Sequence, residues 1–84
     1  MKQIIDNVLY DTEKAEFITN YYVVNCKREL YRTKSDPFKF FAIVWDYFDR
    51  NSNIEKKDEE FVKTLLGKIN IEKYIELFGA PEEA

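Results

Sequence analysis

The strongest constraint on this chain is an apolar run at residues 38–48, in which only Lys39 and Asp46 are charged. β-Branched and aromatic residues fill most of the run, and this composition favours a strand. Successive side chains of a strand point to opposite faces, so Phe40 would lie on one face and Phe41 on the other. A strand with two apolar faces needs cover on both, and a chain of 84 residues has little left to provide it. We therefore expect either that other segments cover both faces or that part of one face is left for a partner.

Length and composition set the other bounds. A chain of this length predicts a single domain over residues 1–84, and an aromatic content of 17% supplies buried area for a small core. The one cysteine, Cys26, cannot form an internal disulfide, which favours the reducing cytoplasm. No apolar run approaches the ~20 residues of a membrane helix, and the N-terminus lacks a signal-peptide core. We expect a cytoplasmic protein with no membrane partner.

The first half, residues 1–48, is expected to be mainly β. Asp6 and Asn7 tolerate positive φ and separate two short apolar runs, which predicts a tight hairpin. A short helical segment is expected near residues 12–16, followed by a strand at residues 18–24. One helix over residues 12–22 is the alternative.

Turn signals then divide the chain into a meander. Turns are expected at residues 25–27 and 34–37, around a strand at residues 28–33. The apolar run supplies the next strand, at residues 38–45. Short connections between these segments predict antiparallel pairing. Residues 49–53 are polar and are expected to form a loop.

The last third predicts two helices within residues 56–79, because apolar residues recur there at helical spacing. Gly67 is expected to stop the first helix, so that Ile69 packs just beyond its end. Asn70 is expected to cap the second helix, and residues 80–84 to form a flexible tail. The predicted fold class is α+β, with an N-terminal β-hairpin and an antiparallel β-meander packed against two short C-terminal helices.

The composition argues against an enzyme or a metal protein. The chain has no histidine and a single cysteine, so the commonest general base and zinc ligands are missing. Its two glycines, at positions 67 and 79, stand alone and cannot form a phosphate loop. The residues Asp49, Asn51, Asn53 and Glu60 lack the glycine that a calcium-binding EF-hand needs. We predict no catalytic residue, no cofactor and no metal site.

Three segments resemble a family of short proteins found on phages and other mobile elements of bacteria. They are residues 9–15 (LYDTE, then Ala15), residues 29–34 (ELYRTK) followed by Phe40 and Phe41, and an acidic helix start at Glu59 and Glu60 followed by residues 74–79 (YIELFG). The chain departs from the family pattern at residues 42–48, where apolar residues replace a glycine-rich polar stretch. The resemblance implies an α+β fold and a mobile-element setting, in which small acidic proteins often resemble inhibitors of host defence, including anti-CRISPR proteins. It implies no catalytic residues.

Charge is unevenly spread along the chain. Residues 1–44 carry seven Lys/Arg and six Asp/Glu (net +1), whereas residues 45–84 carry six and ten (net −4). An acidic surface can dock on basic residues of a partner, and exposed Trp and Tyr are common interface anchors. We therefore predict a partner-binding surface made of Trp45, Asp46, Tyr47, Asp49, Asp58, Glu59 and Glu60. The expected partner is a host protein or ribonucleoprotein complex, and a homodimer mate is the alternative cover for the apolar strand.

A basic segment offers a second hypothesis. It contains Lys27, Arg28, Tyr31, Arg32 and Lys34, which could follow a single-stranded nucleic acid with Tyr31 stacked on a base. The net charge of −3 disfavours direct nucleic-acid binding by the whole protein. The same residues could instead form a charged sheet edge that prevents strand-to-strand aggregation. A small enzyme and a homo-oligomeric structural protein are the remaining alternatives.

Overall fold

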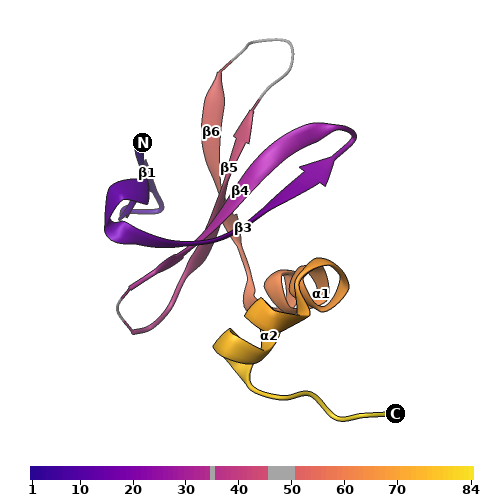
Figure 1. Ribbon diagram of the computed structural model, residues 1–84. Helices are drawn as coiled ribbons and strands as arrows, with labels where there is room; N and C mark the ends of the chain where they lie inside the picture. Colours follow the sequence, from indigo (N-terminus) through magenta and orange to yellow (C-terminus); the bar gives the residue numbers. More distant parts are fainter. Residues whose placement is uncertain (35, 46–50) are drawn as a thin grey trace.

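A computed structural model describes residues 1–34, 36–45 and 51–84 and shows an α+β fold (Figure 1). The strands are β1 (Lys2–Ile5), β2 (Val8–Asp11), β3 (Ala15–Val23), β4 (Cys26–Thr33), β5 (Phe40–Trp45) and β6 (Ser52–Lys57). A 3₁₀ turn, Thr12–Lys14, joins β2 to β3, and the helices are α1 (Glu59–Ile69) and α2 (Ile71–Phe78). The predicted fold class is thus confirmed.

Two sheets form by antiparallel pairing of neighbouring strands. β1 and β2 make a separate hairpin, and the four-stranded sheet has the order β3-β4-β5-β6. The hairpin turn lies at Asp6 and Asn7, whose φ angles of 51° and 65° are the pair that a type I′ turn requires. The predicted hairpin and meander are therefore both present.

β5 is covered on both faces, by different elements. Phe40 and Ala42 pack with Leu30 against Val62 and Leu66 of α1. On the opposite face Phe41 packs with Tyr10 and Ile54, and with Ile5 and Val8 of the N-terminal hairpin. Figure 1 shows this arrangement, with the hairpin and the helices on opposite sides of the sheet. The apolar run thus draws its two covers from opposite ends of the chain.

Several boundaries differ from the prediction in the first half. The segment after the 3₁₀ turn is a strand, so the alternative helix over residues 12–22 is wrong. The β3–β4 turn lies at Val24 and Asn25, with φ angles of 48° and 64°, and β4 already begins at Cys26. β5 begins at Phe40, and Phe38 before it is 48% exposed.

The largest error concerns β6, which takes in residues 52 and 53 of the predicted loop over residues 49–53 and residues 56 and 57 of the predicted helical region, while residues 49 and 50 lie outside the described residues. Ser52–Lys57 is instead a strand that pairs with β5 along its whole length. Its sequence, SNIEKK, contains one apolar residue, Ile54, and this side chain is buried. Pairing with a strongly apolar neighbour overrides the weak intrinsic preference of these residues.

The C-terminal helices agree with their capping signals except at Gly67. The Asp58 side chain accepts a hydrogen bond from Phe61 N at 2.7 Å, and Asn70 Oδ1 accepts one from Lys73 N at 3.1 Å. α1 continues through Gly67 to Ile69, since an isolated glycine costs a helix only about 1 kcal/mol relative to alanine. Ile69 is 50% exposed and does not pack beyond a helix end as expected.

Candidate functional site

Trp45 lies at the end of β5, on the sheet face that the N-terminal hairpin covers only in part. Strand alternation places it on the same face as Phe41 and Ile43. Phe41 is fully buried under the hairpin, whereas Trp45, four residues further along, is 41% exposed. The cover therefore ends before the strand does.

The neighbours of Trp45 come from β3 and β4. Glu29 pairs with Ile43, so Lys27 lies two residues along β4 in the direction of Trp45. Lys27 also pairs with Tyr22 of β3, which is 68% exposed. Lys27, Glu29 and Trp45 line a shallow hollow of about 280 Å³ together with Cys26. We call the surface of Asn20, Tyr22, Lys27, Glu29 and Trp45 the open sheet face.

The sequence predicted Trp45 as an anchor but did not predict its neighbours. Tyr22, Lys27 and Glu29 reach it only through the register of β3, β4 and β5, and no spacing in the chain encodes that register directly. Placing the turn at Val24 and Asn25 would have predicted the register of β3 against β4, because a two-residue turn fixes which residues pair.

Tyr31 lies at the border between the open sheet face and the N-terminal hairpin. Its hydroxyl donates a hydrogen bond to Glu29 Oε1 at 2.8 Å, and its ring is stacked on Phe41 at a centroid distance of 5.5 Å. Phe17 contacts the Tyr31 ring edge-on at 5.6 Å. Burial, and then the hydrogen bond to Glu29 and its negative charge, raise the pKa of Tyr31 from 10.0 to about 12. This contact fixes the Glu29 carboxylate beside the hollow.

We expect this raised pKa to appear in an alkaline titration. The folded chain holds the Tyr31 proton more tightly than the unfolded chain, so the resulting stabilisation is complete below pH 10 and is lost as pH rises through about 12. Ultraviolet absorbance should show a tyrosine ionisation step near pH 12, and Tyr31→Phe should remove that step. A Tyr31→Phe titration curve that keeps the late step would contradict this assignment.

The acidic residues of the predicted surface that the structure describes, Asp58, Glu59 and Glu60, do not join Trp45. Asp58 caps α1, and Glu59 lies 3.7 Å from Lys63 within the same helix. Both follow β6 at the end that pairs with Phe40, whereas Trp45 pairs with Ser52 at the other end. These ends are five positions apart along β6, a distance of roughly 17 Å. Glu60 is exposed on α1, and the predicted residues Asp46, Tyr47 and Asp49 lie outside the described residues.

The basic segment does not form one surface either. It lies on β4, an interior strand of the sheet, so the expected charged edge is wrong. Alternation places Lys27 and Tyr31 on one face and Arg28 and Arg32 on the other, while Lys34 lies beyond the strand end. The Tyr31 ring is already stacked on Phe41, as noted above, and Arg32 is paired with Glu16 at 2.8 Å.

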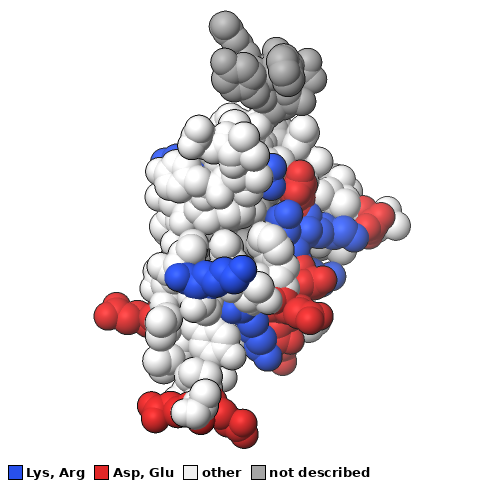
Figure 2. Space-filling view, turned by 90° about the vertical axis from the view of Figure 1, so that its right-hand side faces the viewer, with Lys and Arg blue, Asp and Glu red and all other residues white. Residues whose placement is uncertain are grey.

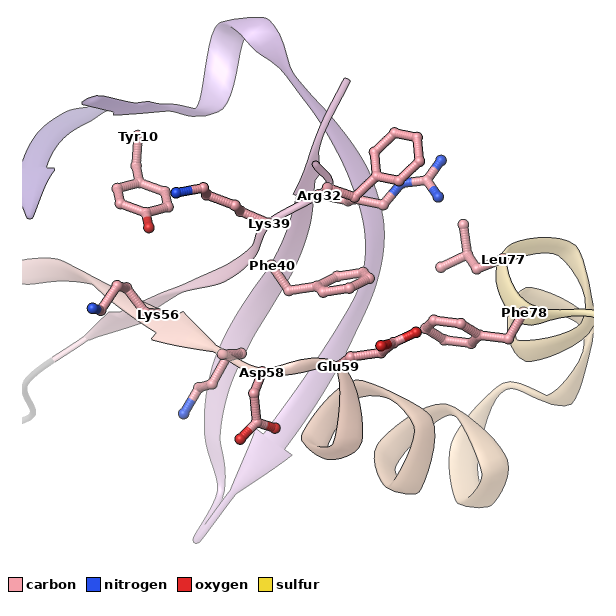
Figure 3. A pocket seen from close by; sticks show the side chains of 11 residues that line it. Tyr10, Arg32, Lys39, Phe40, Lys56, Asp58, Glu59, Leu77 and Phe78 are labelled. Atoms are coloured by element: carbon pink, nitrogen blue, oxygen red, sulfur yellow. The ribbon is translucent and has the colours of Figure 1, made fainter. Parts of the chain in front are cut away.

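A larger groove of about 710 Å³ lies at the end of the sheet opposite Trp45 (Figure 3). Side chains from the N-terminal hairpin, the sheet and both helices line it, among them Tyr10, Lys39, Glu59 and Phe78. Its cations are mostly matched by acids, because Arg32 pairs with Glu16, Lys56 with Asp6 and Lys57 with Glu55. A groove whose cations are mostly paired with acids is poorly suited to a phosphate backbone.

The described residues contain no group of His, Cys, Asp and Glu that could hold a metal ion. Within residues 1–34, 36–45 and 51–84, no helix is long and apolar enough to cross a membrane. No family model, curated protein or solved structure matches this chain. The function must therefore be argued from the surface that its own residues form.

Proposed function

We propose that this chain is a non-enzymatic protein-binding module and that the open sheet face is its contact surface. The observation that carries the proposal is the exposure of Trp45 at the end of a strand whose preceding five residues are all buried. A half-exposed indole gives up much apolar area to a partner, and Trp and Tyr dominate the energetically important residues of known interfaces. Tyr22 adds a second aromatic anchor on the same face.

The polar residues of the open sheet face fit a protein partner. Lys27 and Glu29 carry opposite charges and flank the hollow beside Trp45. The surface therefore offers an apolar centre with one positively and one negatively charged side chain beside it, which resembles the apolar core and polar rim of protein interfaces. A nucleic-acid backbone would instead need an excess of positive charge.

The proposal is tested by capture from a bacterial lysate at low salt with the immobilised protein and two variants. Trp45→Ala should weaken binding of the captured protein by about 30-fold, corresponding to about 2 kcal/mol for loss of a central aromatic anchor. Ile75→Ala is the matched control, because Ile75 of α2 is 45% exposed and Trp45 is 41% exposed, but Ile75 lies on a different element. Retention that falls equally in both variants, or a wild-type chain that retains nothing, would contradict the proposal. Circular dichroism establishes that each variant is folded.

We further propose that the partner belongs to a host nucleic-acid-handling defence complex and that binding inhibits it, as the resemblance to phage and mobile-element proteins implies. The net charge of −3 supports a partner with a basic surface, since complementary charge speeds association. The captured protein should then bind DNA or RNA by itself, and this binding should fall when the present chain is added. A captured partner without nucleic-acid binding would contradict this part and leave the protein-binding proposal intact.

A further inference from the structure

The two edges of the four-stranded sheet differ in how they are protected. At the β6 edge, Ile54 N donates a hydrogen bond to Gln3 Oε1 at 2.9 Å, and Lys56 forms an ion pair with Asp6. The N-terminal hairpin thus shields that edge. At the β3 edge, no backbone hydrogen bond from the described residues reaches the outer side of the strand.

The register of the β3–β4 hairpin shows which backbone groups point outward. The two-residue turn makes Val23 and Cys26 the bonded pair that closes the hairpin. Bonded and non-bonded pairs alternate from there, so the N–H and C=O groups of Tyr22 and Asn20 point away from β4. In agreement, the Asn20 carbonyl oxygen accepts a hydrogen bond at 3.1 Å from the Thr19 hydroxyl and not from β4.

This edge also lacks the residues that usually protect one. Residues 17–26 (FITNYYVVNC) contain no charged residue and no proline. Natural edge strands are commonly blocked by Lys, Pro or a bulge. The β3 bulge lies between Phe17 and Thr19, so it leaves residues 19–23 regular. Figure 2 shows the side of the molecule toward which the β3–β4 turn points; uncharged residues fill much of its upper part, whereas charged side chains lie across its middle and along its right-hand side.

We propose that two copies of this chain pair antiparallel through residues 19–23 of β3, with the two-fold axis at Tyr21. In this register Asn20 of one copy faces Tyr22 of the other, and both residues have outward backbone groups. The two-fold axis produces this pair twice, and each pair exchanges two hydrogen bonds, so four backbone hydrogen bonds form in all. The two sheets then form one eight-stranded sheet with both open sheet faces on the same side.

A second copy fits this edge because the segment is complementary to itself. Its donors and acceptors match across the two-fold axis, and it contains no charge that would repel its own copy. The register also brings the two Tyr21 side chains opposite each other on the helix side. Tyr21 is 4% exposed, and its hydroxyl has no hydrogen-bond partner among the described residues. An interface of this length is at the small end for a dimer, so we expect association that depends on concentration.

The test compares two double variants by sedimentation velocity over a concentration series up to about 1 mM, the range of a weak interface. In Asn20→Lys/Tyr22→Lys, each contact across the axis joins two positive charges. In Asn20→Lys/Tyr22→Glu, the same two side chains are replaced but each contact joins opposite charges. The dissociation constant of the dimer should be at least about tenfold higher for the first variant than for the second.

Three results decide the proposal, provided that circular dichroism shows both variants to be folded. A wild-type dimer that the Lys/Lys variant loses and the Lys/Glu variant keeps would support it. A wild-type chain that stays monomeric throughout the series, or a dimer that both variants keep equally, would overturn it. The inference does not depend on the protein-binding proposal, because it rests on backbone groups of β3, although Asn20 and Tyr22 also belong to the open sheet face. The Trp45 variant, two strands away, tests that proposal separately.

Discussion

Phe41→Ala should lower the free energy of unfolding by about 3–5 kcal/mol, the cost of emptying a fully buried phenylalanine site. Phe41 has no exposed surface and joins the four-stranded sheet to the N-terminal hairpin. Its ring meets Tyr10 edge-on at a centroid distance of 5.2 Å and stacks on Tyr31 at 5.5 Å. The total free energy of unfolding of a domain of this size is only about 4–13 kcal/mol, so urea or heat unfolding should show the loss clearly.

The matched control for Phe41 is Phe38→Ala, which makes the same chemical change three residues earlier. Phe38 is 48% exposed, and the Arg32 guanidinium lies over its ring, 4.4 Å from the centroid. Loss of this contact should cost no more than about 1 kcal/mol. Equal losses of unfolding free energy in the two variants would show that Phe41 is not a core residue that anchors the N-terminal hairpin.

Leu66→Ala tests the opposite face of the sheet and should cost about 2–5 kcal/mol. Leu66 of α1 is fully buried in the cluster that contains Leu30 and Phe40, so its removal leaves a cavity between helix and sheet. The spread in the expected value reflects how far α1 and α2 can settle into that cavity.

Thr64→Ala is the control for Leu66, because Thr64 is exposed on the same helix. Its effect on the free energy of unfolding should stay within about 0.5 kcal/mol. Denaturant unfolding measures both variants, and a Leu66→Ala effect below about 1 kcal/mol would mean that α1 does not seal this face.

The parts of the fold that follow from local chemistry could be predicted from the sequence. Asp6 and Asn7 form the expected tight turn, and Asn70 caps α2 as expected, since in each case neighbouring residues satisfy the backbone. β6 could not be predicted this way, because its strand character comes from pairing with β5. The helix beyond Gly67 was missed for a similar reason, as packing of Leu66 and its neighbours outweighs one glycine.

The candidate site shows the same division. The alternation of β5 and the shortage of chain to cover it identified Trp45 as a candidate for exposure. The acidic residues predicted beside it were grouped by nearness in the sequence. The length of β6 carries Asp58 and Glu59 to the far end of the sheet, where they cap and pair within α1. The residues that do lie beside Trp45 on the open sheet face are instead set by the register of β3, β4 and β5.

Acrylamide quenching of tryptophan fluorescence tests the central claim most directly, because Trp45 is the one tryptophan in the chain and reports on the open sheet face alone. The structure predicts that acrylamide quenches Trp45 in the folded protein, to a degree between that of a buried indole and that of the unfolded chain. If quenching in the folded protein is instead as weak as for a fully buried indole and appears only on unfolding, Trp45 belongs to the core and the proposed contact surface does not exist.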